Sequence, residues 1–268
     1  MIHRDESVAD PAVEAAWDAL DQGELENALT EAGRVGDPGQ RAELEAHAYL
    51  ALGLLDAAAG AIERVREQYG DDDVVTCELD GELALARWEL GAALEAFTAL
   101  AEAERDGRTW QRLALLHDHM GHHDRAHQLL VEASGFDADQ PPPIRVSEST
   151  FDGVVERALA SLRPEFARRL ENVRIVREPV PFEELRGRDH IDVVHPDLLG
   201  LFVGPTIHEL SEDASGELPP TIYLFQRNLE RMVASEEELA EEIRVTLFHE
   251  IGHLLGLDED EVASMGLA

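Results

Sequence analysis

Two histidines and a glutamate near the end of the chain form the strongest chemical pattern in this sequence. They are His249, Glu250 and His253 in the run HEIGH, which fits the pattern HExxH. Residues four apart on an α-helix share one face, so His249 and His253 can present two imidazole nitrogens to one metal ion. Glu250 lies beside them and can act as a general base toward a water at that metal. The pattern therefore predicts a zinc site for hydrolysis, with Glu250 as the catalytic residue.

The residues around the motif predict a helix with defined ends. Ser235 to Glu238 form a capping box, in which the serine hydroxyl accepts from free N–H groups and Glu238 reaches back. Gly256 stands where a left-handed terminating residue is expected. Apolar residues at three- and four-residue spacing indicate a half-buried helix between these ends: Leu239, Ile243, Leu247, Ile251 and Leu254. The motif is expected in the last two turns; the alternative is a helix whose histidines and glutamate only face solvent.

A catalytic zinc site needs a third protein ligand. In the longer pattern HExxHxxGxxH, a glycine turns the chain so that a third histidine returns; here Gly256 is present and Glu259 takes the place of that histidine. A carboxylate is an acceptable zinc donor, so Glu259 is the expected third ligand and Asp258 the second choice. If residues 258–261 are instead a solvated acidic tail, the third ligand is water or a distant histidine. The distant candidates are His190, His195 and His208.

Residues from about 146 to 268 resemble the minimal-zincin family of small bacterial zincin-like metallopeptidases. Five kinds of segment carry the resemblance in the family's order: the first helices (Phe151–Leu159 and Leu162–Phe166), the first strand (Glu171–Val176), the second strand (Leu199–Phe202), the strand before the active helix (Pro220–Phe225) and the signature (Glu242–His253). The family usually carries Asp where this chain has Glu259. The resemblance implies a small α+β fold with a short sheet beside the metal helix, and it implies no particular substrate.

Two runs support strands without reference to the family. Val173, Ile175 and Val176 are β-branched, and 221–225 is an aromatic and β-branched run after two prolines. The polar stretch 211–217 is predicted to be a mobile loop. In zincins an edge strand above the metal helix holds an extended peptide by main-chain pairing. Either strand that borders this loop could take that role.

The first half of the chain repeats a short pattern of glycine and alanine. Four glycines, each followed five residues later by alanine, are spaced by 30, 38 and 30 residues: Gly23/Ala28, Gly53/Ala58, Gly91/Ala96 and Gly121/Ala126. This spacing is close to the tetratricopeptide period of about 34 residues, so residues 11–134 predict four degenerate helix pairs. A generic helical bundle is the alternative. The predicted organisation is an all-α tetratricopeptide-like domain over 1–140, a stiff linker at Pro141–Pro143 and a minimal zincin domain over 146–268.

Five histidines gather near the end of the first half: His117, His119, His122, His123 and His127. Two pairs have the four-residue spacing that suits a transition metal on a helix. The group spans the turn predicted at Gly121, so one continuous helical face is not expected there. A second metal site at these histidines is therefore the less favoured interpretation.

Composition narrows the classes of partner. The 268 residues carry a net charge of −35, and all 22 basic residues are arginine. Such a surface repels nucleic acid and anionic membranes and favours a protein or peptide partner with a basic segment. The single Cys77 excludes an internal disulfide and fits a reducing compartment. Without an apolar signal segment or membrane-spanning run, the chain is expected to be cytoplasmic.

The sequence thus favours a zinc-dependent peptidase whose repeat domain recruits a protein substrate or partner. The alternative is a protein-binding adaptor in which the zincin-like half is structural or only weakly active. The sequence leaves the oligomeric state undetermined.

Overall fold

A computed structural model of the protein describes residues 10–103, 106–136, 141–161, 168, 170, 172–187, 194–206 and 219–257. The chain divides into two compact units, residues 1–105 and 106–268. The described residues form eleven α-helices and one three-stranded sheet, which lies in the C-terminal part as expected. None of the helices in these ranges combines the length and the apolar surface that a bilayer span requires.

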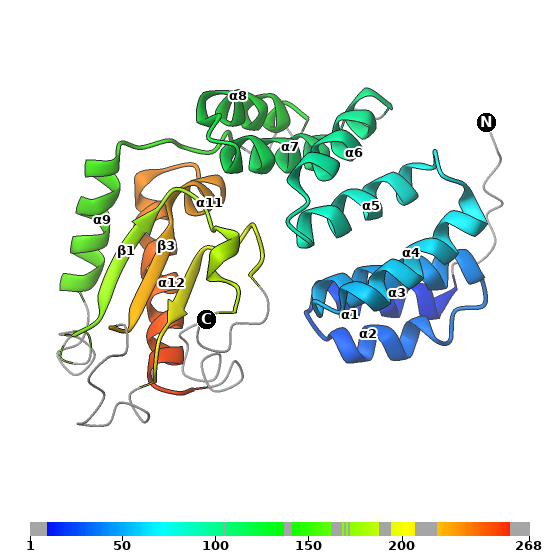
Figure 1. Ribbon diagram of the computed structural model, residues 1–268, viewed down its shortest axis with the longest axis horizontal. Coiled ribbons are helices and arrows are strands. Elements are labelled where there is room, and N and C mark those ends of the chain that lie inside the picture. Colours follow the sequence, from blue (N-terminus) through cyan, green and yellow to red (C-terminus); the bar gives the residue numbers. More distant parts are fainter. Residues whose placement is uncertain are drawn as a thin grey trace. The chain divides into compact units, whose positions relative to one another are not determined.

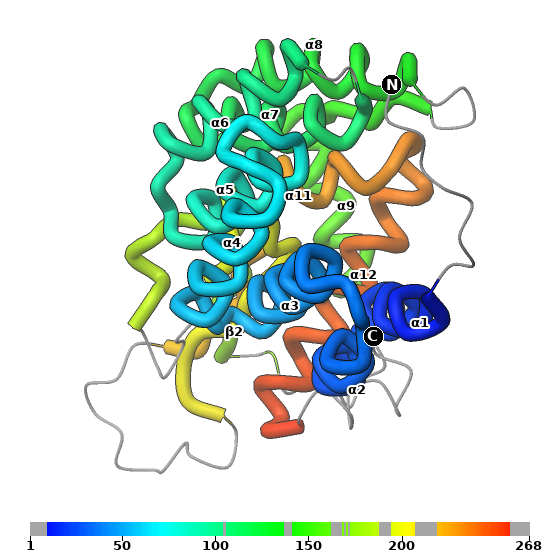
Figure 2. Tube along the Cα trace, turned by 90° about the vertical axis from the view of Figure 1, so that its right-hand side faces the viewer, coloured from blue at the N-terminus to red at the C-terminus, as the bar shows by residue number. Residues whose placement is uncertain are grey.

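The first unit is entirely helical where the structure describes it. From α1 to α6, each helix packs against the next helix in the sequence (Figure 2). Aspartates at the N-caps begin α1, α3 and α5, because their carboxylates accept from free N–H groups of the first turn. The helices are α1 (Pro11–Asp21), α2 (Leu25–Ala32), α3 (Pro38–Ala51), α4 (Leu55–Tyr69), α5 (Val74–Ala86) and α6 (Leu90–Ala103).

Four helix-to-helix turns share one main-chain geometry, and in the third turn a tryptophan takes the place of the glycine. Gly23, Gly53 and Gly121 have φ of +73°, +70° and +75°, and the third turn has Trp88 at φ +63°. In each turn the N–H of the next residue donates to the carbonyl five positions back, over 2.8–2.9 Å, as in a Schellman motif.

Gly91, the third glycine of the sequence pattern, lies inside α6. The turn residue is followed five positions later by a fully buried alanine, and in the third copy that alanine is Ala93 rather than Ala96. The pattern failed there because the turn depends on a left-handed conformation, which tryptophan can also adopt at a cost of about 1–2 kcal/mol. The helical region fits helical repeats, with turn residues 30, 35 and 33 positions apart.

The second unit begins with a helical hairpin and continues into the sheet. Its helices are α7 (Gly107–His119), α8 (His123–Ser134), α9 (Glu148–Ala160), α11 (Gln226–Arg231) and α12 (Glu236–Leu254), with a short 3-10 helix η1 (Glu183–Leu185). Its strands are β1 (Arg174–Glu178), β2 (Gly200–Val203) and β3 (Thr221–Phe225). The predicted fourth helix pair, α7–α8, thus belongs to the same compact unit as the sheet. The domain limits at residues 140 and 146 stay a prediction.

The sheet has the order β1–β3–β2, with β1 parallel and β2 antiparallel to β3. β3 is therefore the central strand and β2 forms one edge. α12 packs against β2, β3 and α9 (Figure 1). The core between them joins Ile222 and Leu224 of β3 with Phe151 and Val154 of α9 and the apolar stripe of α12. This packing fixes the helix that carries the HExxH motif.

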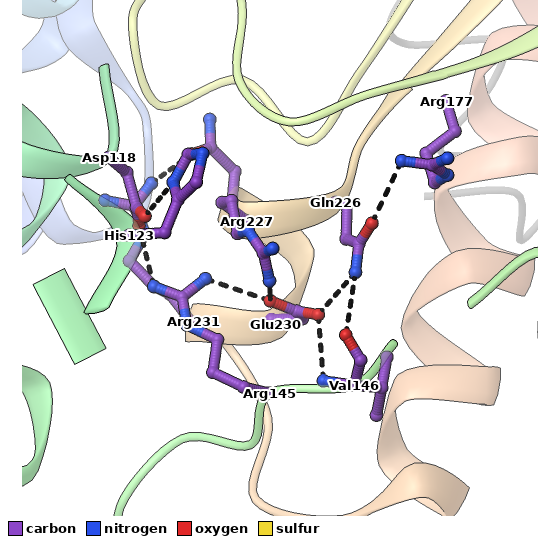
Figure 3. Close-up of polar contacts among 10 residues, drawn as sticks. Asp118, His123, Arg145, Val146, Arg177, Gln226, Arg227, Glu230 and Arg231 are labelled. Carbon is purple, nitrogen blue, oxygen red and sulfur yellow. Dashed lines mark hydrogen bonds and ion pairs between the residues drawn. The ribbon is translucent and has the colours of Figure 1, made fainter. Parts of the chain in front are cut away.

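A buried ionic network connects the hairpin to α11 inside the second unit (Figure 3). Arg145 donates to the carboxylates of Asp118 in α7 (2.7 Å) and Glu230 in α11 (2.9 Å), and neither carboxylate side chain is exposed. His123 also lies on Asp118, with Nδ1 2.9 Å from Oδ1. Buried charges are stable only when they are paired and hydrogen-bonded, so the segment around Arg145 is tied to both elements.

Glu230 has more partners than any single ion pair would supply. Besides Arg145, it accepts from Arg227 Nη1 (2.8 Å), Gln226 Nε2 (2.7 Å) and the Val146 N–H (3.1 Å). Gln226 in turn donates to the Val146 carbonyl over 3.2 Å. These bonds hold the extended segment before α9 against the start of α11 (Figure 3).

Candidate metal centre

Helix α12, which carries the HExxH motif, begins and ends where the sequence predicts. The Ser235 hydroxyl accepts from the Glu238 N–H over 3.2 Å, and Glu238 reaches back to the Ala234 N–H at 2.7 Å, one residue before the cap. Gly256 has φ +78°, and the Leu257 N–H donates to the Gly252 carbonyl. The five apolar residues of the predicted stripe are all fully buried. The HExxH motif therefore occupies the last two turns of a helix anchored along one face.

His249 and His253 point toward each other from consecutive turns. Their Nε2 atoms lie 3.0 Å apart, and the two rings meet edge to face at 81°. Two imidazole donors on one tetrahedral zinc, at about 2.0–2.1 Å each, would lie roughly 3.4 Å apart. If the two Nε2 atoms moved apart by a few tenths of an ångström, both could therefore coordinate one zinc ion. The pair fits the zinc that the sequence predicts.

Glu250 is held against the edge strand β2. Glu250 is 6 % exposed, and its Oε2 accepts from the Phe202 N–H over 2.7 Å. Main-chain groups of an antiparallel strand alternate between its two edges. The Leu199 carbonyl faces β3, where it accepts from the Phe225 N–H at 2.9 Å. The main-chain N–H and carbonyl groups of Gly200 and Phe202 therefore face the opposite edge of β2. That outer edge of β2 is the one that meets Glu250.

Gly200 allows this approach because it has no side chain. A Cβ at this position would lie 2.6 Å from Thr246 Cγ2, 3.1 Å from Glu250 Oε1 and 3.2 Å from Glu250 Cγ. No larger residue fits without moving the helix, the strand or the glutamate. Gly200 and the Phe202 N–H were missed in the sequence because a glycine beside a strand is also an ordinary turn signal. The only clue was the close spacing of Gly200 and Phe202 in a segment that resembles a zincin strand.

Of the other predicted metal ligands, only His195 lies among the residues that the structure describes. Glu259, Asp258, His190 and His208 lie outside the described residues, as does the predicted loop 211–217. His195 is described, and its Nδ1 lies 2.8 Å from Asp197 Oδ1. No group of three or more metal-binding side chains occurs within the part of the chain that the structure describes. The structure therefore brings together His249, Glu250 and His253 and leaves the third ligand a prediction.

The histidines of the α7–α8 turn separate into different environments. His117 and His122 approach with their Nδ1 atoms 3.4 Å apart. His119 Nε2 lies 2.8 Å from the Pro196 carbonyl, and burial is the main cause that lowers the pKa of His119. His123 lies on Asp118, as described above. Of these side chains, His117 and His122 approach each other, whereas His119 and His123 each lie on a different partner.

Comparison with known protein families bears on the sheet and on α12. Residues 170–267 match the zincin-like metallopeptidase family. The matched stretch holds all three strands, α11 and α12, and it covers a little over a third of the chain. The match stops short of α9 and of the helix pairs. No curated protein matches the chain.

Proposed function

We propose that the protein is a zinc-dependent peptidase. The observation that carries the proposal is the pair of facing Nε2 atoms of His249 and His253, with the buried Glu250 next to His249 on the same helix. The family match over 170–267 supports the same class of activity. His249 and His253 would hold the metal, with Glu259 as the third ligand. Zinc bound there would supply a Lewis acid for a peptide carbonyl and lower the pKa of a water to about 7.

Glu250 is proposed to act as the general base. Glu250 follows His249 directly on α12, and its carboxylate is anchored through Oε2 by a main-chain donor. A carboxylate at this position of the motif can take a proton from water and later give it to the leaving amine. Burial against β2 limits the rotamers of Glu250, so the proton acceptor is positioned before substrate arrives.

The edge of β2 is the proposed binding surface for the peptide. Of the two strands left open by the sequence, β3 pairs on both sides and β2 pairs on one side within the described sheet. An extended peptide adding to β2 would offer a carbonyl to the Phe202 N–H. Glu250 would then exchange this bond for one to water, so substrate pairing and release of the base would occur together.

Metal analysis of purified protein tests the proposal. After zinc loading and desalting, wild type should retain one zinc per chain, and His249→Ala or His253→Ala should retain none. Glu250→Gln should retain zinc, because the amide removes only the proton acceptor, and should lose peptide hydrolysis. Wild type at background zinc, or Glu250→Gln with full hydrolysis, would contradict the assignment.

Variants of the acidic residues that follow the helix identify the third ligand. Glu259→Ala should weaken zinc binding, whereas its neighbour Asp260→Ala should not. Two variants with the wild-type zinc affinity would place the ligand elsewhere, with Asp258 and the distant histidines as the next candidates. A competition titration against a chromogenic zinc chelator measures all three affinities under one condition.

We further propose that the helix pairs are of the tetratricopeptide type and recruit a protein with a basic segment. Support comes from the consecutive packing of α1 to α6, the shared turn geometry and the net charge of −35. Stacked helix pairs expose an extended surface for peptides. Its attraction to a basic segment should fade with salt, since screening acts over about 8 Å at physiological strength.

Cell extract incubated with full-length protein separates the peptidase from a protein-binding adaptor. A peptidase creates new N-termini in a substrate that the Glu250→Gln variant retains uncut, and a chelator prevents those cuts. An adaptor retains the same partner with or without the chelator and cuts it under no condition. Mass spectrometry of N-termini, compared between wild type and Glu250→Gln, gives the readout.

A further inference from the structure

A cavity of about 700 Å³ lies within the second unit, among the α7–α8 hairpin, the segment before β2 and α11. Small-molecule sites typically measure roughly 300–1,000 Å³. Polar groups line part of it, from three arginines, Asn228 and Asp197, and the remaining wall includes Leu130, Leu199 and Met232. None of the HExxH residues lines it. The cavity is therefore a second concave site with both polar and apolar surface.

Positive charge exceeds negative charge among the described residues that line this cavity. Arg108, Arg112 and Arg231 carry three guanidinium groups against the one carboxylate of Asp197. That carboxylate already has partners, with His195 Nδ1 at 2.8 Å and Arg112 Nη1 at 3.4 Å. Burial alone would raise the pKa of Asp197, but His195 and the two nearby arginines hold it well below its usual range. The described lining of the cavity thus carries a net positive charge in a chain whose net charge is −35.

Arg231 lines the cavity from the end of α11. Its Nη2 donates to Oδ1 of Asn228, which is a neutral amide. Burial lowers the pKa of Arg231 to about 10, although Asp118 and Asp197 act in the opposite direction. The guanidinium stays charged at neutral pH but is only partly exposed, so it has lost part of its solvation. An oxyanion beside it would offset that loss of solvation.

Asn228 builds the wall of the cavity as well as orienting Arg231. It is 1 % exposed, and its Nδ2 donates to the carbonyls of Pro196 (3.0 Å) and Leu198 (2.7 Å). These bonds fix the segment that brings Asp197 to the cavity. A site whose donors are already oriented loses less conformational entropy when a ligand binds.

We propose that this cavity binds a small organic anion with two or more phosphate or carboxylate groups. The planar forks of the arginines match the oxygens of both groups. Leu130 and Leu199 would contact the apolar part of such a molecule. Phosphate and carboxylate ligands of this kind are both compact polyanions, and ADP and citrate serve as probes that distinguish them.

Isothermal titration of full-length protein with ADP and with citrate, both without divalent metal, tests the proposal. The His249→Ala background is used throughout, so that zinc held by the HExxH motif cannot contribute. Saturable binding of at least one probe at one site per chain is expected. Arg231→Gln and Arg108→Gln should each weaken it roughly tenfold or more, because each removes a charged donor. Arg108 is exposed, so its variant serves if Arg231→Gln fails to fold.

Arg125→Gln is the matched control, since Arg125 lies on α8 outside the cavity and pairs with Glu132 at 3.6 Å. Binding to this variant should equal that of the parent. Binding of ADP alone would identify phosphate as the source, and binding of citrate alone would identify carboxylate. The proposal is overturned if neither probe binds above background, or if Arg125→Gln weakens binding as much as Arg108→Gln. Since zinc plays no part in this experiment, its result is independent of the proposed peptidase.

Discussion

Replacing Gly200 with alanine tests the packing of the metal helix against β2. The new Cβ would lie 2.6 Å from Thr246 Cγ2, where carbon atoms normally keep about 3.5–4.0 Å. The strand or the helix must therefore move by about 1 Å, and overpacking of this kind costs roughly 1–3 kcal/mol. If Glu250 also gives way and loses the Phe202 N–H, a further cost of about 1.5–3 kcal/mol follows. Peptide hydrolysis should fall with the displacement of Glu250.

A neighbouring glycine provides the control. A Cβ at Gly153 in α9 would meet only Arg157 Nη1, at an ordinary 3.6 Å. Gly153→Ala should therefore stabilise the same unit by up to about 1 kcal/mol through helix propensity. The two Gly→Ala changes are expected to have opposite signs.

The assay is urea unfolding in a shared Trp17→Phe, Trp88→Phe background. The chain has three tryptophans, so Trp110 in α7 then reports on the second unit alone. Thr246→Ser deletes the closest atom, and the double variant with Gly200→Ala should recover part of the lost stability. A double-mutant cycle measures this coupling. Strict additivity, or a Gly200→Ala protein as stable as its parent, would refute the steric argument.

Three further predictions concern other parts of the molecule. Arg145→Met should lower the free energy of unfolding by about 3–5 kcal/mol, since two fully buried carboxylates lose a charged donor. Arg244→Met, at a side chain that is 42 % exposed, should lower it by about 0–1 kcal/mol, and equal urea midpoints for the two variants would contradict the network. Gly53→Ala should destabilise the first unit by about 1–2 kcal/mol because of the positive φ of Gly53, whereas Gly91→Ala should be neutral or stabilising. The reverse order of thermal unfolding temperatures would contradict the placement of the third turn at Trp88. Burial lowers the pKa of His119, so the contribution of the neutral His119 side chain to the free energy of unfolding is complete above about pH 6.5 and is lost as the pH falls below that value. His119→Gln should flatten the change in urea midpoint between pH 7.5 and 5.5, and an unchanged slope would show that His119 does not cause this pH dependence.

Local patterns predicted more of this protein than contacts between distant residues did. The stripe from Leu239 to Leu254 and the caps at Ser235 and Gly256 define α12 because each signal acts within a few residues. Strand limits shifted by one to three residues: the strand expected at 171–176 runs over 174–178. Strand ends depend on pairing with β3, which the local sequence does not encode.

Contacts across the fold left weaker traces in the sequence. The bond between Glu250 and the Phe202 N–H joins residues 48 positions apart. The pair of Arg145 and Glu230 spans 85 positions. Neither follows from a helical or strand period, because side-chain partners are chosen by the tertiary fold. Trp88 escaped notice for a different reason, since its turn is specified by main-chain bonds and its residue type argues against it.

The ionic network around Arg145 has a consequence for how the second unit opens. Breaking α7 away would expose Asp118 without its guanidinium, and the same arginine is bound to α11. The hairpin and the sheet region should therefore exchange their amide hydrogens as one cooperative unit. The helix pairs of the first unit contact mainly their neighbours in sequence, so their amides can open one pair at a time. Native-state hydrogen exchange should then show the amides of α1 to α6 opening at lower free energies than those of α7 and α11.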